Sequence, residues 1–122
     1  MKLFPVYSTN ESTVPGVLFN CAEPEAITLA LREIKADSKL TRRLDEGRIR
    51  LGAYANRLTP VAPNWSLAES DGPQEFRKDL DPQQYVDFVS TWIDELNVTI
   101  VGGCCGITPE HIAALKSAVR SR

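Results

Sequence analysis

Residues 98–111 read VTIVGGCCGITPEH, and this stretch decides the fold of the chain. Its apolar, β-branched start is typical of a buried strand. Thr108 is a preferred helix-capping residue and Pro109 suits the first helical position, so a helix is predicted to follow at once. Between the two lie Cys104 and Cys105, bracketed by glycines that let the backbone turn. Both thiols are therefore expected at the carboxyl end of a strand.

A second stretch of the chain has the same arrangement. Residues 17–21 form a short apolar run that ends in Cys21, and a helix is predicted to begin at Pro24. Ligand sites of parallel α/β folds lie at the carboxyl ends of the strands. The sequence therefore predicts that Cys21 joins Cys104 and Cys105 at one edge of a sheet, as a third candidate metal ligand.

The remaining segments complete the alternation of strands and helices. Residues 49–56 are predicted to form a strand, and the apolar stripe after Asp81 predicts a core-packed helix. A short helical piece is expected around Leu40 and Leu44. Residues 57–80 show no clear periodicity, which is typical of either a lid over a site or a surface loop.

The order of these elements predicts the fold class. Strands that alternate with amphipathic helices indicate an α/β fold built from parallel βαβ units with right-handed crossovers. Residues 1–122 are expected to form a single domain, in which residues 1–16 are irregular because they carry many turn formers and little periodicity.

Composition narrows the function classes. The chain has 122 residues, 43% of them hydrophobic, and a net charge of −2, which is ordinary for one globular domain. The charge is too small to argue for nucleic acid or a membrane surface as partner, and we expect neither. No signal peptide is recognised at the N-terminus. Three cysteines fit poorly with a closed disulfide set, so a reducing cytoplasmic location is expected.

Three thiolates define what chemistry this chain could support. Zinc takes thiolate ligands, and three protein ligands with one open position describe a catalytic site. The open position could accept a substrate thiol and favour its deprotonation. Two other interpretations stay open, namely inert buried cysteines and a vicinal disulfide between Cys104 and Cys105. His111, in the first turn of the last helix, is interpreted as a cap neighbour rather than a ligand.

These motifs resemble those of the homocysteine S-methyltransferase family. Residues 102–112, GGCCGITPEHI, resemble its C-terminal zinc signature, with Ile107 as a small departure, and residues 19–21 are similar to its Asn-Cys motif. Residues 54–56 resemble a Tyr-Pro-Asn segment more loosely. The resemblance implies zinc as cofactor and no catalytic residues beyond its ligands. It assigns Cys21, Cys104 and Cys105 as metal ligands and makes Asn20 and Asn56 candidate substrate contacts.

The resemblance also implies a reaction and a larger architecture. Members of the family transfer a methyl group from a donor to the thiol of homocysteine, which gives methionine. They are (β/α)8 TIM barrels of roughly 250 residues, so this chain corresponds to the last three strand–helix units of an incomplete barrel. We therefore expect self-association or an N-terminal barrel-half partner, and little turnover by the isolated chain. The alternatives are a non-catalytic zinc-binding or interaction module and a redox dithiol protein.

Overall fold

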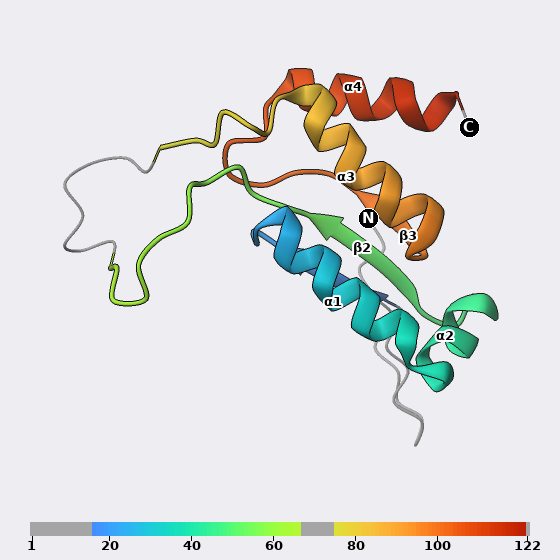
Figure 1. Ribbon diagram of the computed structural model, residues 1–122. Helices are drawn as coiled ribbons and strands as arrows, with labels where there is room; N and C mark the ends of the chain where they lie inside the picture. The colour runs from blue at the N-terminus through green and yellow to red at the C-terminus, as the bar shows by residue number, and fades with distance from the viewer. Residues whose placement is uncertain (1–15, 67–74, 122) are drawn as a thin grey trace, which may run out of the picture.

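The computed structural model describes residues 16–66 and 75–121. Within them the strands β1 (Gly16–Asn20), β2 (Arg50–Tyr54) and β3 (Val98–Val101) alternate with the helices α1 (Pro24–Ala36), α2 (Ser38–Asp45), α3 (Pro82–Glu95) and α4 (Pro109–Arg120) (Figure 1). The strands form one parallel sheet in the order β1-β2-β3. The predicted parallel α/β organisation is confirmed. The segment predicted to be irregular, residues 1–16, lies outside the described residues except for Gly16, which begins β1.

Two strands end earlier than the sequence predicted. The strand expected at 17–21 runs from Gly16 to Asn20, and the strand expected at 49–56 ends at Tyr54. The reason lies at Cys21, whose backbone has a φ of 50°, in the left-handed region where a strand cannot continue. The last residue pair between β1 and β2 joins Asn20 to Tyr54. Because β1 turns away after Asn20, its pairing with β2 ends at Tyr54.

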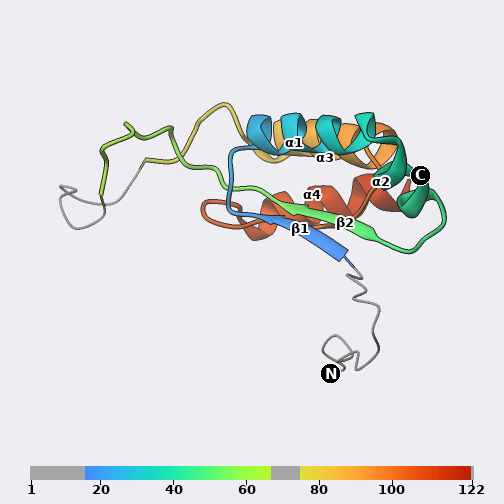
Figure 2. The same ribbon diagram turned by 90° about the horizontal axis from the view of Figure 1, so that it is seen from below.

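Helices cover one face of the sheet only. Leu51 and Ala53 of β2 belong to a buried core shared with residues of α1, α3 and α4. Figure 2 shows α1 and α3 along one side of the strands. The opposite face carries Leu18, Gly52 and Ile100, because a Cβ atom built on Gly52 would lie 2.5 Å from Leu18 Cδ2 and 3.0 Å from Ile100 Cβ. No helix among the described residues lies on this face, and Ile100 is 40% exposed there. We call it the uncovered face.

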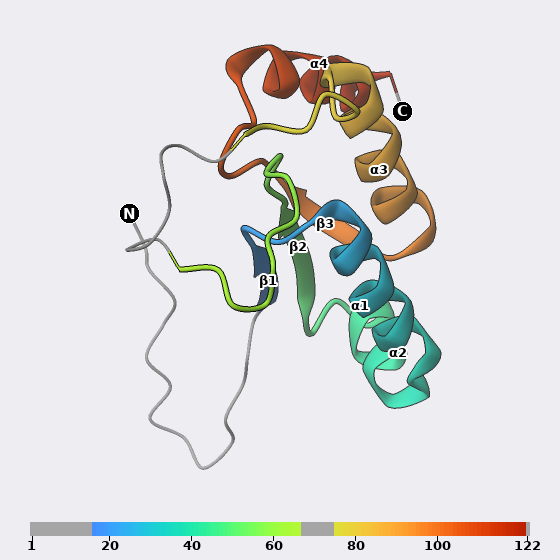
Figure 3. The same cartoon turned by 60° about the vertical axis from the view of Figure 1, so that its left-hand side comes forward.

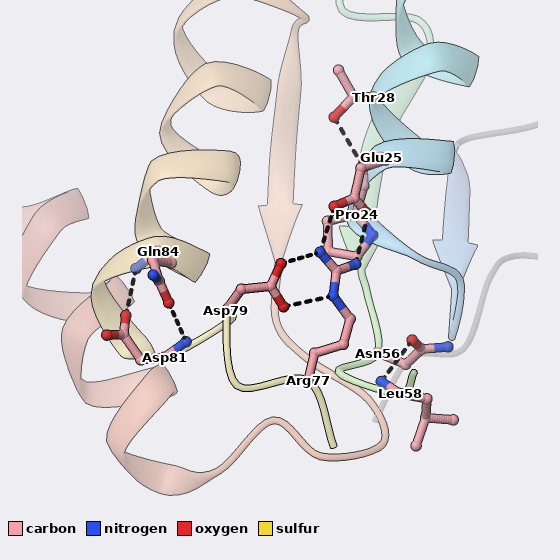
Figure 4. Close-up of polar contacts among 9 residues, drawn as sticks. All are labelled: Pro24, Glu25, Thr28, Asn56, Leu58, Arg77, Asp79, Asp81 and Gln84. Atoms are coloured by element: carbon pink, nitrogen blue, oxygen red, sulfur yellow. Dashed lines mark hydrogen bonds and ion pairs between the residues drawn. The ribbon is translucent and has the colours of Figure 1, made fainter. Parts of the chain in front are cut away.

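The helices α1, α3 and α4 begin where the sequence predicted. At the start of α3, Asp81 accepts a hydrogen bond from the main chain of Gln84, whose side chain accepts one from the main chain of Asp81 (Figure 4). This capping box satisfies amide groups that the helix itself leaves free. The start of α4 has a similar box between Thr108 and His111. Within the described residues, no helix has the length and apolar character needed to cross a bilayer.

The two described parts of the long loop are tied to each other and to α1. Leu58 and Phe76 form an antiparallel bridge, and Arg57 exchanges hydrogen bonds with Arg77. The guanidinium of Arg77 is 13% exposed and pairs with Glu25 at 2.6 Å and with Asp79 at 2.8 Å (Figure 4). Residues 75–80 are therefore fixed against the start of α1, while residues 67–74 lie outside the described part of the loop (Figure 3).

The Arg77 network predicts an acid-sensitive contribution to stability. Hydrogen bonds from Arg77 lower the pKa of Glu25 and of Asp79, so the unfolded chain binds more protons at these carboxyls than the folded chain. The stabilisation is complete above the ordinary carboxyl pKa and is lost as the pH falls through the lowered native value. Arg77→Met should reduce the free energy of unfolding by about 1 kcal/mol at pH 6, measured by urea denaturation.

The reduction should shrink as the pH falls from the ordinary carboxyl pKa toward the lowered native value, because the carboxylates that Arg77 binds become protonated. Arg48→Met is the matched control, because its ion pair with Glu46 is exposed and should contribute little at any pH. An effect of Arg77→Met that stays constant from pH 6 to pH 3 would contradict this account.

Candidate metal centre

The three cysteines converge at the carboxyl end of the sheet. The Sγ atoms of Cys21 and Cys105 lie 3.6 Å apart, and those of Cys104 and Cys105 lie 4.0 Å apart. All three sulfur atoms lie within 4.8 Å of one another, although Cys21 is more than eighty residues from the other two in the chain. Cys105 is exposed and the other two are half-buried. A metal ion and a ligand from solution could therefore both reach the sulfurs.

The spacing of the sulfur atoms fits a zinc ion. Tetrahedral zinc with Zn–S bonds of about 2.3 Å places its sulfur ligands about 3.8 Å apart. The measured separations of 3.6 and 4.0 Å lie on either side of that value. Three thiolates also leave one tetrahedral position for another ligand. Three thiols within 4.8 Å of one another could therefore hold a metal ion such as zinc.

The cysteine loops are held on the residues that extend β2. On one side, Cys21 N–H donates to the carbonyl of Tyr54, and Asn56 N–H donates to the carbonyl of Ala22. On the other side, the N–H of Cys104 donates to the carbonyl of residue 55, and the N–H of residue 57 donates to the carbonyl of Cys105. Residues 54–57, which we call the central extension, therefore set the distance between the two loops.

The first cysteine occupies a strained position. A left-handed backbone costs a residue other than glycine about 1–2 kcal/mol, so the φ of 50° at Cys21 requires compensation from its surroundings. This conformation ends β1 and accompanies the approach of the Cys21 thiol to that of Cys105. Asn20, the preceding residue, is the exposed last residue of β1. Its predicted role as a substrate contact stays a prediction.

Two glycines allow the second loop to turn. A Cβ atom on Gly103 would lie 2.2 Å from Ile107 Cγ2, so only glycine fits this close approach. Gly106 has a φ of +81°, a conformation that favours glycine, and packs against Arg57 and Phe76. The predicted turn after the strand thus depends on these two positions.

Tyr85 of α3 is a functional residue that the sequence analysis did not single out. Its hydroxyl donates to the carbonyl of Gly102 at 2.8 Å and accepts from Ala55 N–H at 3.2 Å, which links the central extension to the loop before Cys104. The side chain is fully buried, and this burial raises the pKa of Tyr85 to about 12. The sequence offers one signal for this role, which is a tyrosine within the apolar stripe of α3. A tyrosine buried there needs a hydrogen-bond partner for its hydroxyl.

His111 lies outside the sulfur cluster and has a capping role. Its Nε2 lies 2.8 Å from the carbonyl of Leu80, which can only accept, so Nε2 carries the proton. Its Nδ1 accepts from the main chain of Thr108 at 3.2 Å. Both ring nitrogens are therefore used within the chain, in agreement with the interpretation of His111 as a cap neighbour.

The thiols influence one another's protonation. The hydrogen bond with Cys104 lowers the pKa of Cys21, whereas the same contact and burial raise the pKa of Cys104 to about 11. Of this pair, Cys21 is therefore the thiol that deprotonates more readily. A separate hollow lined by Lys35, Arg42 and Asp45 lies between α1 and α2, at the opposite end of the sheet, and has no cysteine in its lining.

Comparisons with known proteins show which proteins this chain is similar to. Residues 5–119 match the family model described as homocysteine S-methyltransferase. The chain is 30% identical to a betaine-homocysteine S-methyltransferase of Drosophila melanogaster over 109 residues, which are 89% of this chain and 28% of that protein. It is 33% identical to a methionine synthase of Mycobacterium leprae (strain TN) over 69 residues, 57% of this chain and 6% of that protein. No solved structure matches the chain significantly.

The chain belongs to the homocysteine S-methyltransferase family. It spans less than a third of the length of either relative.

Tyr85→Phe tests the hydrogen bonds that hold the centre. The substitution leaves the buried N–H of Ala55 and the carbonyl of Gly102 without their partner, which should lower the free energy of unfolding by about 1–3 kcal/mol in urea denaturation. Tyr54→Phe is the matched control, because that half-buried side chain lies on the uncovered face and should change stability by less than about 0.5 kcal/mol. Equal effects of the two variants would refute the role given to Tyr85.

Proposed function

We propose that this chain carries the zinc-binding part of an enzyme that transfers a methyl group to the thiol of homocysteine and forms methionine. The observation that supports this most directly is the convergence of three thiols from two distant segments within 4.8 Å. Family membership supports the nature of the reaction. The names of the two relatives, a betaine-homocysteine S-methyltransferase and a methionine synthase, are consistent with homocysteine as acceptor.

The residues of the chain would prepare the acceptor thiol. When bound, zinc stabilises the thiolate form of a thiol that takes its open position, which provides a nucleophile near neutral pH. Cys21, Cys104 and Cys105 would hold the ion, and exposed Cys105 lies on the side from which a ligand can approach. Asn20, exposed beside Cys21, is placed where it could contact the substrate. A reducing compartment such as the cytoplasm would keep the three thiols free.

Further strand–helix units are part of the proposal. Parallel sheets normally have both faces covered, whereas here one face has no helix among the described residues. At the β3 edge lies an apolar groove lined by Val101, Ile112, Leu115, Lys116 and Val119. Another strand beside β3, with its helix on α4, would fill this groove and continue the right-handed order. The methyl donor and the remainder of the homocysteine site would bind to such units in a complete TIM barrel.

Metal content and thiol binding test the proposal together. The purified 122-residue chain should contain one zinc ion per chain by elemental mass spectrometry, and Cys21→Ser and Cys105→Ser should each lose most of it. With Co²⁺ in place of zinc, homocysteine should change the visible absorption spectrum, because a fourth thiolate alters the ligand field. Homoserine, which has a hydroxyl in place of the thiol, is the matched control ligand and should leave the spectrum unchanged.

Other outcomes would assign the chain differently. Zinc binding without a response to homocysteine would favour a non-catalytic zinc-binding module. A chain that binds no zinc and readily forms a disulfide would favour a redox dithiol protein. Methyl transfer to homocysteine by the isolated chain at an ordinary enzymatic rate would refute the need for further units.

The self-association of the isolated chain tests whether the apolar groove at the β3 edge makes contacts with other chains. The isolated chain should sediment as a dimer or larger species, because Ile112 and Val119 are each 43% exposed beside the groove. Replacing both by glutamate should raise the dissociation constant at least about tenfold in sedimentation velocity, since charges would enter an apolar contact. Ser117→Glu adds charge to an exposed position on another side of α4 and should leave association unchanged. A clean monomer at all concentrations would contradict the prediction.

A further inference from the structure

The side chain of Asn56 uses both of its polar atoms within the chain. Its Nδ2 donates to the main-chain carbonyl of Cys21 at 2.9 Å. Its Oδ1 accepts from the main-chain N–H of Leu58 at 3.2 Å, and Figure 4 shows this second hydrogen bond. The carbonyl can only accept and the N–H can only donate, so these partners determine the orientation of the amide. Asn56 is only 8% exposed, which leaves it little access to a substrate.

We infer that Asn56 is a positioning residue of the metal centre, which holds Cys21 in the conformation that brings its thiol to the other two. This inference rests on the proposed zinc site and adds a role for a residue that is not itself a ligand. It also differs from the substrate contact predicted for Asn56 from the sequence, which stays a prediction.

The hydrogen bonds around Cys21 explain how this would work. Its N–H donates to the carbonyl of Tyr54 at 3.0 Å, and its carbonyl accepts from Asn56 Nδ2. The main-chain N–H of Asn56 donates to the next carbonyl, that of Ala22, at 2.9 Å. Cys21 is thus held on both sides by the central extension. Without the amide, its carbonyl would lose a partner, and the left-handed backbone with a φ of 50° would lose a restraint.

The position of the sulfur depends on that backbone. The Cys21 thiol lies 3.6 Å from Cys105 Sγ only while the chain turns at Cys21 instead of continuing β1. Asn56 Nδ2 also lies 3.9 Å from Cys21 Sγ, so one amide group contacts both the carbonyl and the thiol of the same residue. A relaxed, extended Cys21 would move its sulfur away from Cys104 and Cys105, and the site would retain two of its three ligands.

Asn56→Asp is the sharpest test, because aspartate has nearly the same shape and keeps the acceptor for Leu58 but cannot donate to Cys21. On the 122-residue chain, the zinc dissociation constant is measured by competition with a chromophoric chelator. It should rise about 10- to 100-fold, the usual effect of removing a partner that orients a metal ligand. With Co²⁺ alone, the sulfur-to-metal charge-transfer absorption should fall because one thiolate is lost, while circular dichroism shows the fold retained.

Asn97→Asp is the matched control. It makes the same amide-to-carboxylate change at another left-handed residue, with a φ of 63°, at the end of the sheet opposite the cysteines. Its zinc affinity and Co²⁺ spectrum should equal those of the unsubstituted chain. Asn56→Ser is the second variant, since its shorter side chain retains an acceptor oxygen but cannot reach the carbonyl of Cys21. It should weaken zinc binding in the same way if Asn56→Asp fails to fold.

The outcomes separate this inference from the proposed function. An unsubstituted chain that binds no zinc would refute the metal centre itself and the role of Asn56 with it. Zinc binding by the unsubstituted chain, with unchanged affinity and Co²⁺ spectrum in both Asn56 variants, would overturn only the positioning role. Loss of the fold in both variants would also overturn it, because Asn56 would then support the whole domain rather than one ligand.

Discussion

The hydrogen bonds made by residues 54–57 are the constraint on which the rest of the site depends. These residues are the last residue of β2 and the three that follow it, and they bind one cysteine loop on each side. Because the two loops share this one support, the spacing of neighbouring strands fixes how far apart their backbones lie, and the turns at Cys21 and after Gly103 accompany the approach of the thiols. The geometry of the candidate metal centre therefore begins with the sheet, and the side chains of Tyr85 and Asn56 add further hydrogen bonds to it.

The site combines strain with buried polar contacts. Cys21 and Gly106 adopt left-handed backbones, and Gly103 leaves room for the close approach of Ile107. Tyr85 and Asn56 offset this strain, since each buries a polar side chain whose hydrogen bonds join the strand ends. Such contacts favour a single arrangement, because a buried polar group that loses its hydrogen-bond partner lowers the stability of the fold. The same contacts that stabilise the fold therefore restrict the thiols to one geometry.

The uncovered face and the exposed sulfurs belong to one architecture. Parallel strands covered by helices on one face only leave apolar groups such as Ile100 exposed, and the cysteines open onto solvent at the end of those strands. The family relatives are several times longer than this chain, with 28% and 6% of their lengths matched. In the proposed function, the missing units would cover the sheet and enclose the reacting groups, while the metal ligands all come from this chain.

The sequence by itself determined the parallel α/β order, the helix starts and the position of each cysteine after a strand, because turn formers, caps and apolar periodicity are local properties. It placed the strand ends at Cys21 and Asn56 one or two residues late, since the left-handed turn at Cys21 has no local signal. The long-range hydrogen bonds of Tyr85 and Asn56 were decided only by the tertiary structure. Each joins partners at least seventeen residues apart, which only the folded chain brings within hydrogen-bond distance.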